Sequence, residues 1–184
     1  MNIVGRLALI AAALLSLSAC GGAGVSGTTS TTAAVSAATQ ALAGPTGEYA
    51  AEASYAAVLE KFGQVEPYVT IHAQELRHIQ ALTRQLQRLG AEVPDNPWTG
   101  TIPAPESLKA AAEAWAQGEV DNVALYDTLA ADVDGDRLLT RVFANLRRAS
   151  QDCHLPMFQA AAAGDGTLQP SQMVSCGGMN GQGP

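Results

Sequence analysis

The sequence predicts an all-α protein folded as an antiparallel four-helix bundle. Of its 184 residues, 47% are hydrophobic but only 5% are aromatic, and alanine predominates, which suits closely packed helices better than sheets. Apolar residues recur at steps of three and four in four separate segments. A proline-rich segment, 91–105, forms a long connector between the second and third of them. One domain is expected.

The N-terminus has the features of an export signal. Arg6 precedes an apolar run, Leu7 to Leu17, which is too short for a membrane span of roughly 20 residues. The run ends in Leu17-Ser18-Ala19-Cys20, which resembles the lipobox of bacterial lipoproteins. That resemblance implies a signal peptide at 1–19 and a lipidated Cys20. Gly21 follows in place of aspartate, so we expect an anchor in the outer membrane facing the periplasm rather than in the inner membrane.

Two low-complexity segments flank the expected bundle at 47–162. Residues 20–46 hold the lipidated cysteine followed mainly by Gly, Ser, Thr and Ala, a composition typical of a flexible linker. Residues 163–184 are again rich in Gly and turn-forming residues. We expect this C-terminal tail to be disordered.

The first two helices carry acids on their apolar faces. The helix expected at 47–62 ends before Gly63, and the helix expected at 67–89 ends before Gly90, because glycine commonly terminates helices. The first stripe contains Glu48, Glu52, Tyr55, Leu59 and Phe62, and the second contains Glu75, His78, Leu82, Leu86 and Leu89.

The last two helices repeat this arrangement. The helix expected at 106–132 places Glu119 on the apolar face of Trp115 and Tyr126. The helix expected at 136–162 begins with the capping residue Asp136. Its candidate site residues are Gln151, Cys153 and His154.

Glu75 and His78 predict a metal site. Residues three apart lie side by side on a helix, and this pair points along a stripe that must be buried. An ionised carboxylate is costly to bury without a partner, so an acid and an imidazole aimed at a bundle core indicate a cation between them. Tyr55 and Tyr126 are expected to pack and to hydrogen-bond buried acids rather than to act in redox chemistry.

Several short motifs, in order and spacing, resemble the ferritin-like proteins of domain of unknown function 2202. The resemblance covers about residues 46 to 162 and implies a ferritin-like bundle with a two-metal carboxylate site and no settled reaction. The motifs are Tyr55-Ala56-Ala57-Val58-Leu59-Glu60-Lys61-Phe62-Gly63, Glu75-Leu76-Arg77-His78-Ile79, Glu119-Val120-Asp121-Asn122-Val123, Val142-Phe143-Ala144-Asn145-Leu146-Arg147-Arg148-Ala149-Ser150 and His154-Leu155.

Under this resemblance the metal ligands are taken from all four helices. In the ferritin-like scheme two helices give one Glu each and the other two give a Glu-x-x-His pair each. The expected ligands are Glu48, Glu52, Glu75, His78, Glu119 and His154. Iron is the expected metal, and manganese or zinc would suit the same ligands.

The fourth helix departs from the pattern. Gln151 stands where the scheme has a Glu, and one extra residue separates Ser150 from His154. A regular helix would direct Cys153 inward instead of His154, so either a local bulge turns the histidine or the site is incomplete. Glu52, one turn from Glu48, is the candidate replacement for the missing acid.

The cysteines and the tail leave two alternatives open. An exported chain meets oxidising conditions, so Cys153 and Cys176 could form a disulfide, which would remove Cys153 from any metal site. Alternatively, Met173, Cys176 and Met179 recur at steps of three and could bind copper(I).

Three functions follow from these observations. The first is a membrane-anchored protein that binds iron or a similar divalent metal and carries out metal oxidation or oxygen or peroxide chemistry. The second is a lipid-anchored, non-catalytic helical module that contacts protein partners at the cell envelope. The third is copper binding by the tail. The net charge of -7 and the lack of a basic cluster exclude nucleic-acid binding.

Overall fold

The computed structural model describes residues 25–174 and 176, with side chains from residue 30 onward. The expected signal peptide, the lipidation site Cys20 and Met179 of the copper alternative lie outside these residues. Within the described part, no helix combines the length and the apolar character needed to cross a membrane.

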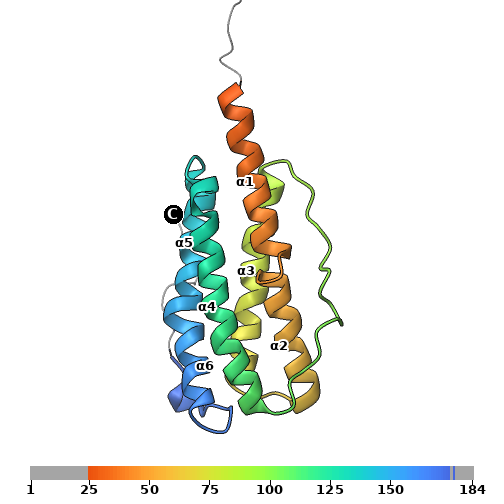
Figure 1. Ribbon diagram of the computed structural model, residues 1–184, viewed down its shortest axis with the longest axis vertical. Coiled ribbons are helices and arrows are strands. Elements are labelled where there is room, and N and C mark those ends of the chain that lie inside the picture. Colours follow the sequence, from red (N-terminus) through yellow and green to blue (C-terminus); the bar gives the residue numbers. More distant parts are fainter. Residues whose placement is uncertain (1–24, 175, 177–184) are drawn as a thin grey trace, which may run out of the picture.

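The described residues form an all-α four-helix bundle, as the sequence predicts (Figure 1). We call each of the four helical positions of the bundle a column. The first column consists of α1 (Val25–Ala43) and α2 (Glu48–Phe62), the second of α3 (Tyr68–Arg88) and the third of α4 (Leu108–Val133). The last column runs from α5 (Arg137–Ala149) through the π-helical segment η1 (Ser150–His154) to α6 (Leu155–Ala162). A short 3-10 helix, η2 (Pro170–Gln172), follows in the tail.

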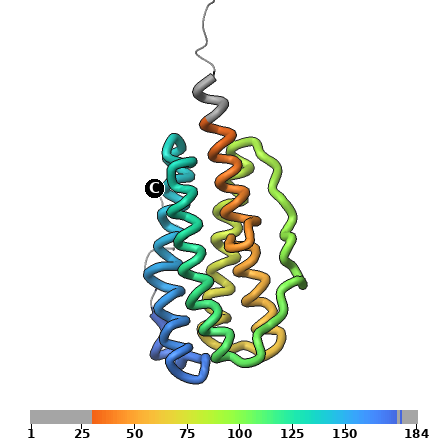
Figure 2. Tube along the Cα trace, in the orientation of Figure 1, coloured from red at the N-terminus to blue at the C-terminus, as the bar shows by residue number. Residues whose placement is uncertain are grey.

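The connector 89–107 determines the topology. It leaves α3 at one end of the bundle and runs along the outside to the other end, where α4 begins (Figure 2). As a result α3 and α4 run parallel, whereas the α1–α2 and α5–α6 columns run in the opposite direction (Figure 1). Gly63 and Gly90 have positive φ at the ends of α2 and α3, which agrees with their expected role as helix stops.

The expectation of a flexible linker over 20–46 is wrong from Val25 to Ala43, which form α1. Alanine has the highest helix propensity, and its small side chain lets neighbouring helices approach closely. The buried residues recur at helical spacing and form an apolar stripe, which consists of Ala34, Ala37, Ala38, Ala41 and Leu42. The abundance of Ser and Thr on the other faces hides this stripe in the composition.

The column breaks at residues 44–47, where α2 begins anew. Pro45 has no backbone N–H to donate to a helical hydrogen bond. A Cβ atom at Gly47 would lie 2.5 Å from the carbonyl oxygen of Ala41. This break places Glu48 in the first turn of α2, facing the interior of the bundle.

The expectation of a disordered tail is wrong for residues 163–174 and 176. Leu168 is buried, and its N–H donates to the carbonyl oxygen of Glu66 at 2.9 Å. Cys176 forms a disulfide with Cys153, the two Cα atoms being 5.6 Å apart. The tail therefore packs against the α6 end of the bundle.

The apolar core consists of two clusters separated along the helices by a polar layer. One cluster includes Leu82 and Phe143, and the other includes Ile71 and Phe158. The buried polar residues lie at helix positions between these clusters, and they are Glu48, Ser54, Glu75, His78, Glu119, Asn122, Ser150 and His154.

Candidate metal centre

Three carboxylates and two imidazoles converge in the polar layer. Glu48 comes from α2, Glu75 and His78 from α3, Glu119 from α4 and His154 from η1, so every column contributes. Each of these residues is at most 3% exposed. Carboxylates this deeply buried require compensating positive charge.

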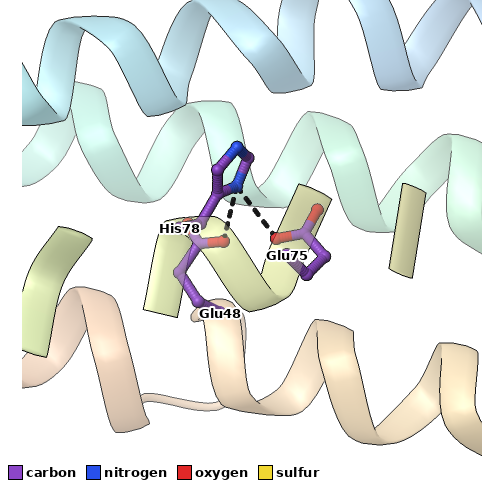
Figure 3. A group of neighbouring side chains, drawn as sticks. All are labelled: Glu48, Glu75 and His78. Atoms are coloured by element: carbon purple, nitrogen blue, oxygen red, sulfur yellow. Dashed lines mark hydrogen bonds and ion pairs between the residues drawn. The ribbon is translucent and has the colours of Figure 1, made fainter. Parts of the chain in front are cut away.

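The first half of the centre is formed by Glu48, Glu75 and His78. The Nδ1 atom of His78 lies 3.1 Å from Oε2 of Glu48 and 3.0 Å from Oε2 of Glu75. Figure 3 shows both carboxylates turned toward this one nitrogen. We call this group the Glu48–His78 half.

The second half is formed by Glu75, Glu119 and His154. The Nδ1 atom of His154 lies 3.1 Å from Oε1 of Glu75 and 3.4 Å from Oε2 of Glu119. We call this group the Glu119–His154 half. Glu75 belongs to both halves and directs one oxygen to each, as a carboxylate that bridges two metal ions does.

The separations fit ligands of a metal ion. Two ligands bound at about 2.1 Å, with roughly 90° between them, are about 3 Å apart. In each half the three ligand atoms lie within 4.8 Å of one another. Among the described residues, Nδ1 of His154 makes no well-aligned hydrogen bond, although it is buried 3.1 Å from Oε1 of Glu75. A ring nitrogen that faces carboxylate oxygens at this distance without aligning on them is placed to bind a metal ion together with them.

Tyrosines fix the outer oxygens of two of the carboxylates. The hydroxyl of Tyr55 donates to Oε1 of Glu119 at 2.5 Å, and the hydroxyl of Tyr126 donates to Oε1 of Glu48. Burial and the nearby carboxylates raise the pKa of both phenols well above 10, so they keep their protons. The expected hydrogen-bonding role of these tyrosines is confirmed.

Gln74 fixes the orientation of His154. Its Oε1 lies 2.8 Å from Nε2 of His154, and its Nε2 donates to Sγ of Cys176 at 3.5 Å. The amide oxygen of Gln74 can only accept, so the His154 ring donates its Nε2 proton to Gln74, and Nδ1, which faces the carboxylates, is the nitrogen that would bind a metal ion once it has lost its proton. By contrast, Nε2 of His78 has no partner within the described part of the chain.

The groups of the centre shift one another's pKa. Burial, together with the charge of Glu75, raises the pKa of Glu48 to about 7. Burial opposes ionisation of Glu75, but His78 outweighs it and holds the pKa of Glu75 well below 4.5. Burial likewise disfavours charged imidazoles, yet the carboxylates raise the pKa of His154 to about 9 and that of His78 well above 6.5. In the metal-free protein, imidazolium ions thus balance the carboxylates.

Glu52 does not join the centre, contrary to expectation. Its Oε1 lies 3.1 Å from Nε2 of His72, and its Oε2 accepts a hydrogen bond from Asn96 at 3.3 Å. One helical turn beyond Glu48, the side chain has rotated toward the connector. Glu52 therefore holds the connector against α2 and α3.

A bulge turns His154 inward, which resolves the alternative left open by the sequence. The N–H of Leu155 donates to the carbonyl of Ser150, five residues earlier, as in a π-helix. The extra residue lets both Cys153 and His154 be buried, while Gln151 is exposed and contacts Arg147.

Ser150 and Asn122 belong to the polar layer but were not singled out from the sequence. Because the π-helical segment adds one residue, Ser150 stands where the scheme has the fourth acid. Its Oγ donates to Oδ1 of Asn122 at 2.8 Å, and Asn122 donates to the carbonyl of Thr46 at 3.0 Å. The position of Asn122 three residues after Glu119 was the available signal.

Comparison with known proteins supports the fold. No family model matches the chain, and no curated protein matches it. Among solved structures, it is similar to the bacterioferritin of Desulfovibrio desulfuricans, described with its diiron site in different catalytic states. The TM-score is 0.63 at 18% identity, over 73% of this chain and 80% of the bacterioferritin chain. At this identity the match shows the fold alone, which is ferritin-like.

Proposed function

We propose that this protein binds iron or a similar divalent metal in the bundle core, and that the metal is oxidised there or used in oxygen or peroxide chemistry. The observation that carries this proposal is the placement of two imidazole Nδ1 atoms on either side of one buried, shared carboxylate, Glu75. Glu48 and Glu119 complete the two halves. This ligand set is also what the resemblance to the ferritin-like proteins of domain of unknown function 2202 implies.

The residues of the chain account for binding and orientation. Glu75 would lie between two ions, His78 and His154 would each bind one, and the tyrosines would hold Glu48 and Glu119 in position. Three carboxylates balance most of the charge of two divalent ions. Bound iron supplies one-electron redox chemistry. Mixed carboxylate and imidazole ligands also suit manganese and zinc.

We further propose that the chain is exported and anchored through a lipidated Cys20 in the outer membrane, facing the periplasm. The motif Leu17-Ser18-Ala19-Cys20 supports this. Because α1 begins at Val25, only residues 21–24 separate the anchor from a helix of the bundle. Four residues span at most roughly 14 Å, so the start of α1 would be held near the membrane surface, and the metal centre would lie beyond the 19 residues of α1.

The test is the metal content of the chain from Gly21 onward, which retains α1, after loading with Fe²⁺, Mn²⁺ or Zn²⁺ without oxygen. We expect stoichiometric metal, abolished by Glu75→Ala and reduced by His78→Ala. The matched control is Glu52→Ala with His72→Ala, an acid and a histidine that contact each other outside the centre. These two changes should leave the metal content intact.

Two outcomes would contradict the proposal. Absence of metal under every loading condition would favour the alternative of a partner-binding module. Bound metal that is lost only on deleting residues 173–179 would favour the tail, although Cys176 is bonded to Cys153 and offers no free thiolate while that bond persists.

A further inference from the structure

A cleft of about 340 Å³ leads from the surface to the metal centre. Its walls come from the α1–α2 break, α2, the connector and α4. Its buried lining residues include Glu75 and Glu119 of the Glu119–His154 half, together with Tyr55. Glu75 is shared by both halves, and the described lining includes none of Glu48, His78 and His154, so Glu119 is the residue that places the cleft beside the Glu119–His154 half.

One wall of the cleft is built by an aromatic ring that requires a glycine. Trp115 packs edge-on against Tyr55, with ring centroids 4.5 Å apart. A Cβ atom at Gly118 would lie 2.7 Å from the Trp115 ring, so the ring can lie along α4 only because residue 118 is glycine. A glycine within a helix costs about 1 kcal/mol relative to alanine. Here the glycine allows the Trp115 ring to form part of the cleft wall.

The size of the cleft indicates a ligand larger than oxygen or an ion. Water occupies about 30 Å³ per molecule in the liquid, so the cleft has room for roughly ten. Sites for small organic molecules begin at about 300 Å³. A path that served only oxygen, peroxide or a metal ion would not need this volume.

The lining determines the chemical class of the ligand. Much of it is apolar, including Ala51, Ile102, Pro103 and Trp115. Of the described residues that line the cleft, Glu75, Glu119 and Asp121 are acids and none is Lys, Arg or His. An anionic ligand would meet carboxylates and no basic side chain there. The charges of Glu75 and Glu119 are balanced by the imidazoles of the centre, or by bound metal, so a cation gains little from them and a neutral ligand is favoured.

We infer that the cleft binds a small, neutral, largely apolar organic molecule beside the Glu119–His154 half. That this molecule is the substrate of the centre rests on the proposed function, whereas its binding to the cleft can be measured independently. The nearer half would then act on the molecule, and the Glu48–His78 half would lie behind it.

The test compares two ligands that share a ring and differ in charge. Isothermal titration calorimetry of the chain from Gly21 onward, with and without bound metal, should show binding of p-cresol and at least tenfold weaker binding of 4-methylbenzoate. Ala51→Phe fills the cleft from α2 and should weaken p-cresol binding at least tenfold. Ala56→Phe, at a similarly half-buried position of α2 outside this cleft, is the matched control and should leave binding unchanged.

If Ala51→Phe does not fold, Ala114→Phe fills the cleft from an exposed position of α4. Failure to bind p-cresol, equal losses in the Ala51 and Ala56 variants, or preference for 4-methylbenzoate would overturn the inference. So would slower Co²⁺ uptake in Ala51→Phe without p-cresol binding, since the cleft would then be an ion path. Metal content measured on the same samples separates these outcomes from failure of the proposed function.

Discussion

The two halves of the centre use the same kinds of ligand but are built differently. His78 lies on a regular helix three residues after Glu75, and its Nε2 has no partner among the described residues. His154 ends a π-helical segment, and Gln74 holds its Nε2. The Glu75–His78 pair of the first half is thus determined by local helix geometry, whereas the second half depends on a bulge, a neighbouring side chain and the tail.

This difference indicates how the halves should respond to change. Gln74 contacts both the His154 ring and Cys176, so the tail reaches the second half through one side chain. No such link from the tail to His78 is present within the described residues. Perturbing the tail should therefore affect the halves unequally.

The largest effect is expected from the acids. Glu48→Ala should remove the ion of the first half and Glu119→Ala that of the second, because each acid belongs to one half, whereas Glu75→Ala should remove both. Metal analysis of loaded protein measures this directly. If all three variants lose the same amount of metal, the halves are not separate sites.

Gln74→Leu should weaken the second half and spare the first. The leucine keeps similar volume but cannot accept the Nε2 proton of His154, and loss of such an outer partner typically costs 10- to 100-fold in metal affinity. Competition titration of Co²⁺ against a chelator would resolve the two affinities. The control is Gln80→Leu on the same helix. Equal losses in the two variants would contradict the orienting role of Gln74.

Breaking the disulfide should lower the metal affinity less than Gln74→Leu does, and it should clearly lower the stability of the fold. A bond closing a loop of this length, with a sequence separation of 23, contributes about 3 kcal/mol in the chain-entropy model. Cys176→Ser should therefore lower the Tm and weaken the second half several-fold, as judged by calorimetry and chelator competition. An unchanged Tm together with unchanged affinity would show that the tail does not support the site.

The smallest expected effect is on the pH dependence of the metal-free protein. Folding raises the pKa of His154 from 6.5 to about 9, so its contribution to stability is fully present below pH 6.5 and is lost as the pH rises through 9. The Tm should fall between pH 6.5 and 9, and fall less in His154→Gln. Bound metal should oppose this fall, because metal and protons compete for the imidazoles. A Tm that rises over this range would contradict the assignment.

The sequence predicts Glu75 and His78 of the first half well because the geometry of this pair is local. Glu75 and His78 lie three residues apart on one regular helix, so their common inward face follows from spacing alone. Local spacing also explains why the prediction of Glu52 as a ligand is wrong. Glu52 shares a stripe with Glu48, but it lies one turn further along α2, where its side chain contacts His72 and the connector residue Asn96. Spacing along a helix does not reveal which neighbour covers each turn.

The second half could be predicted only in part. The extra residue before His154 indicates a bulge or a broken site, and deciding between them requires the packing of η1 against α4 and the tail. The helix α1 was missed because an alanine stripe among Ser and Thr has the composition of a linker, and its burial depends on helices distant in the sequence. The long connector was predictable because its prolines exclude regular helix.

The most direct test is anomalous scattering from crystals of the Fe²⁺-loaded protein, which locates bound ions without reference to activity. Two peaks are expected, one on each side of the Glu75 carboxylate, near His78 and His154. Fe²⁺-loaded crystals that show no peak beside Glu75, or peaks only at the tail near Met173 and Cys176, would contradict a metal centre in the bundle core.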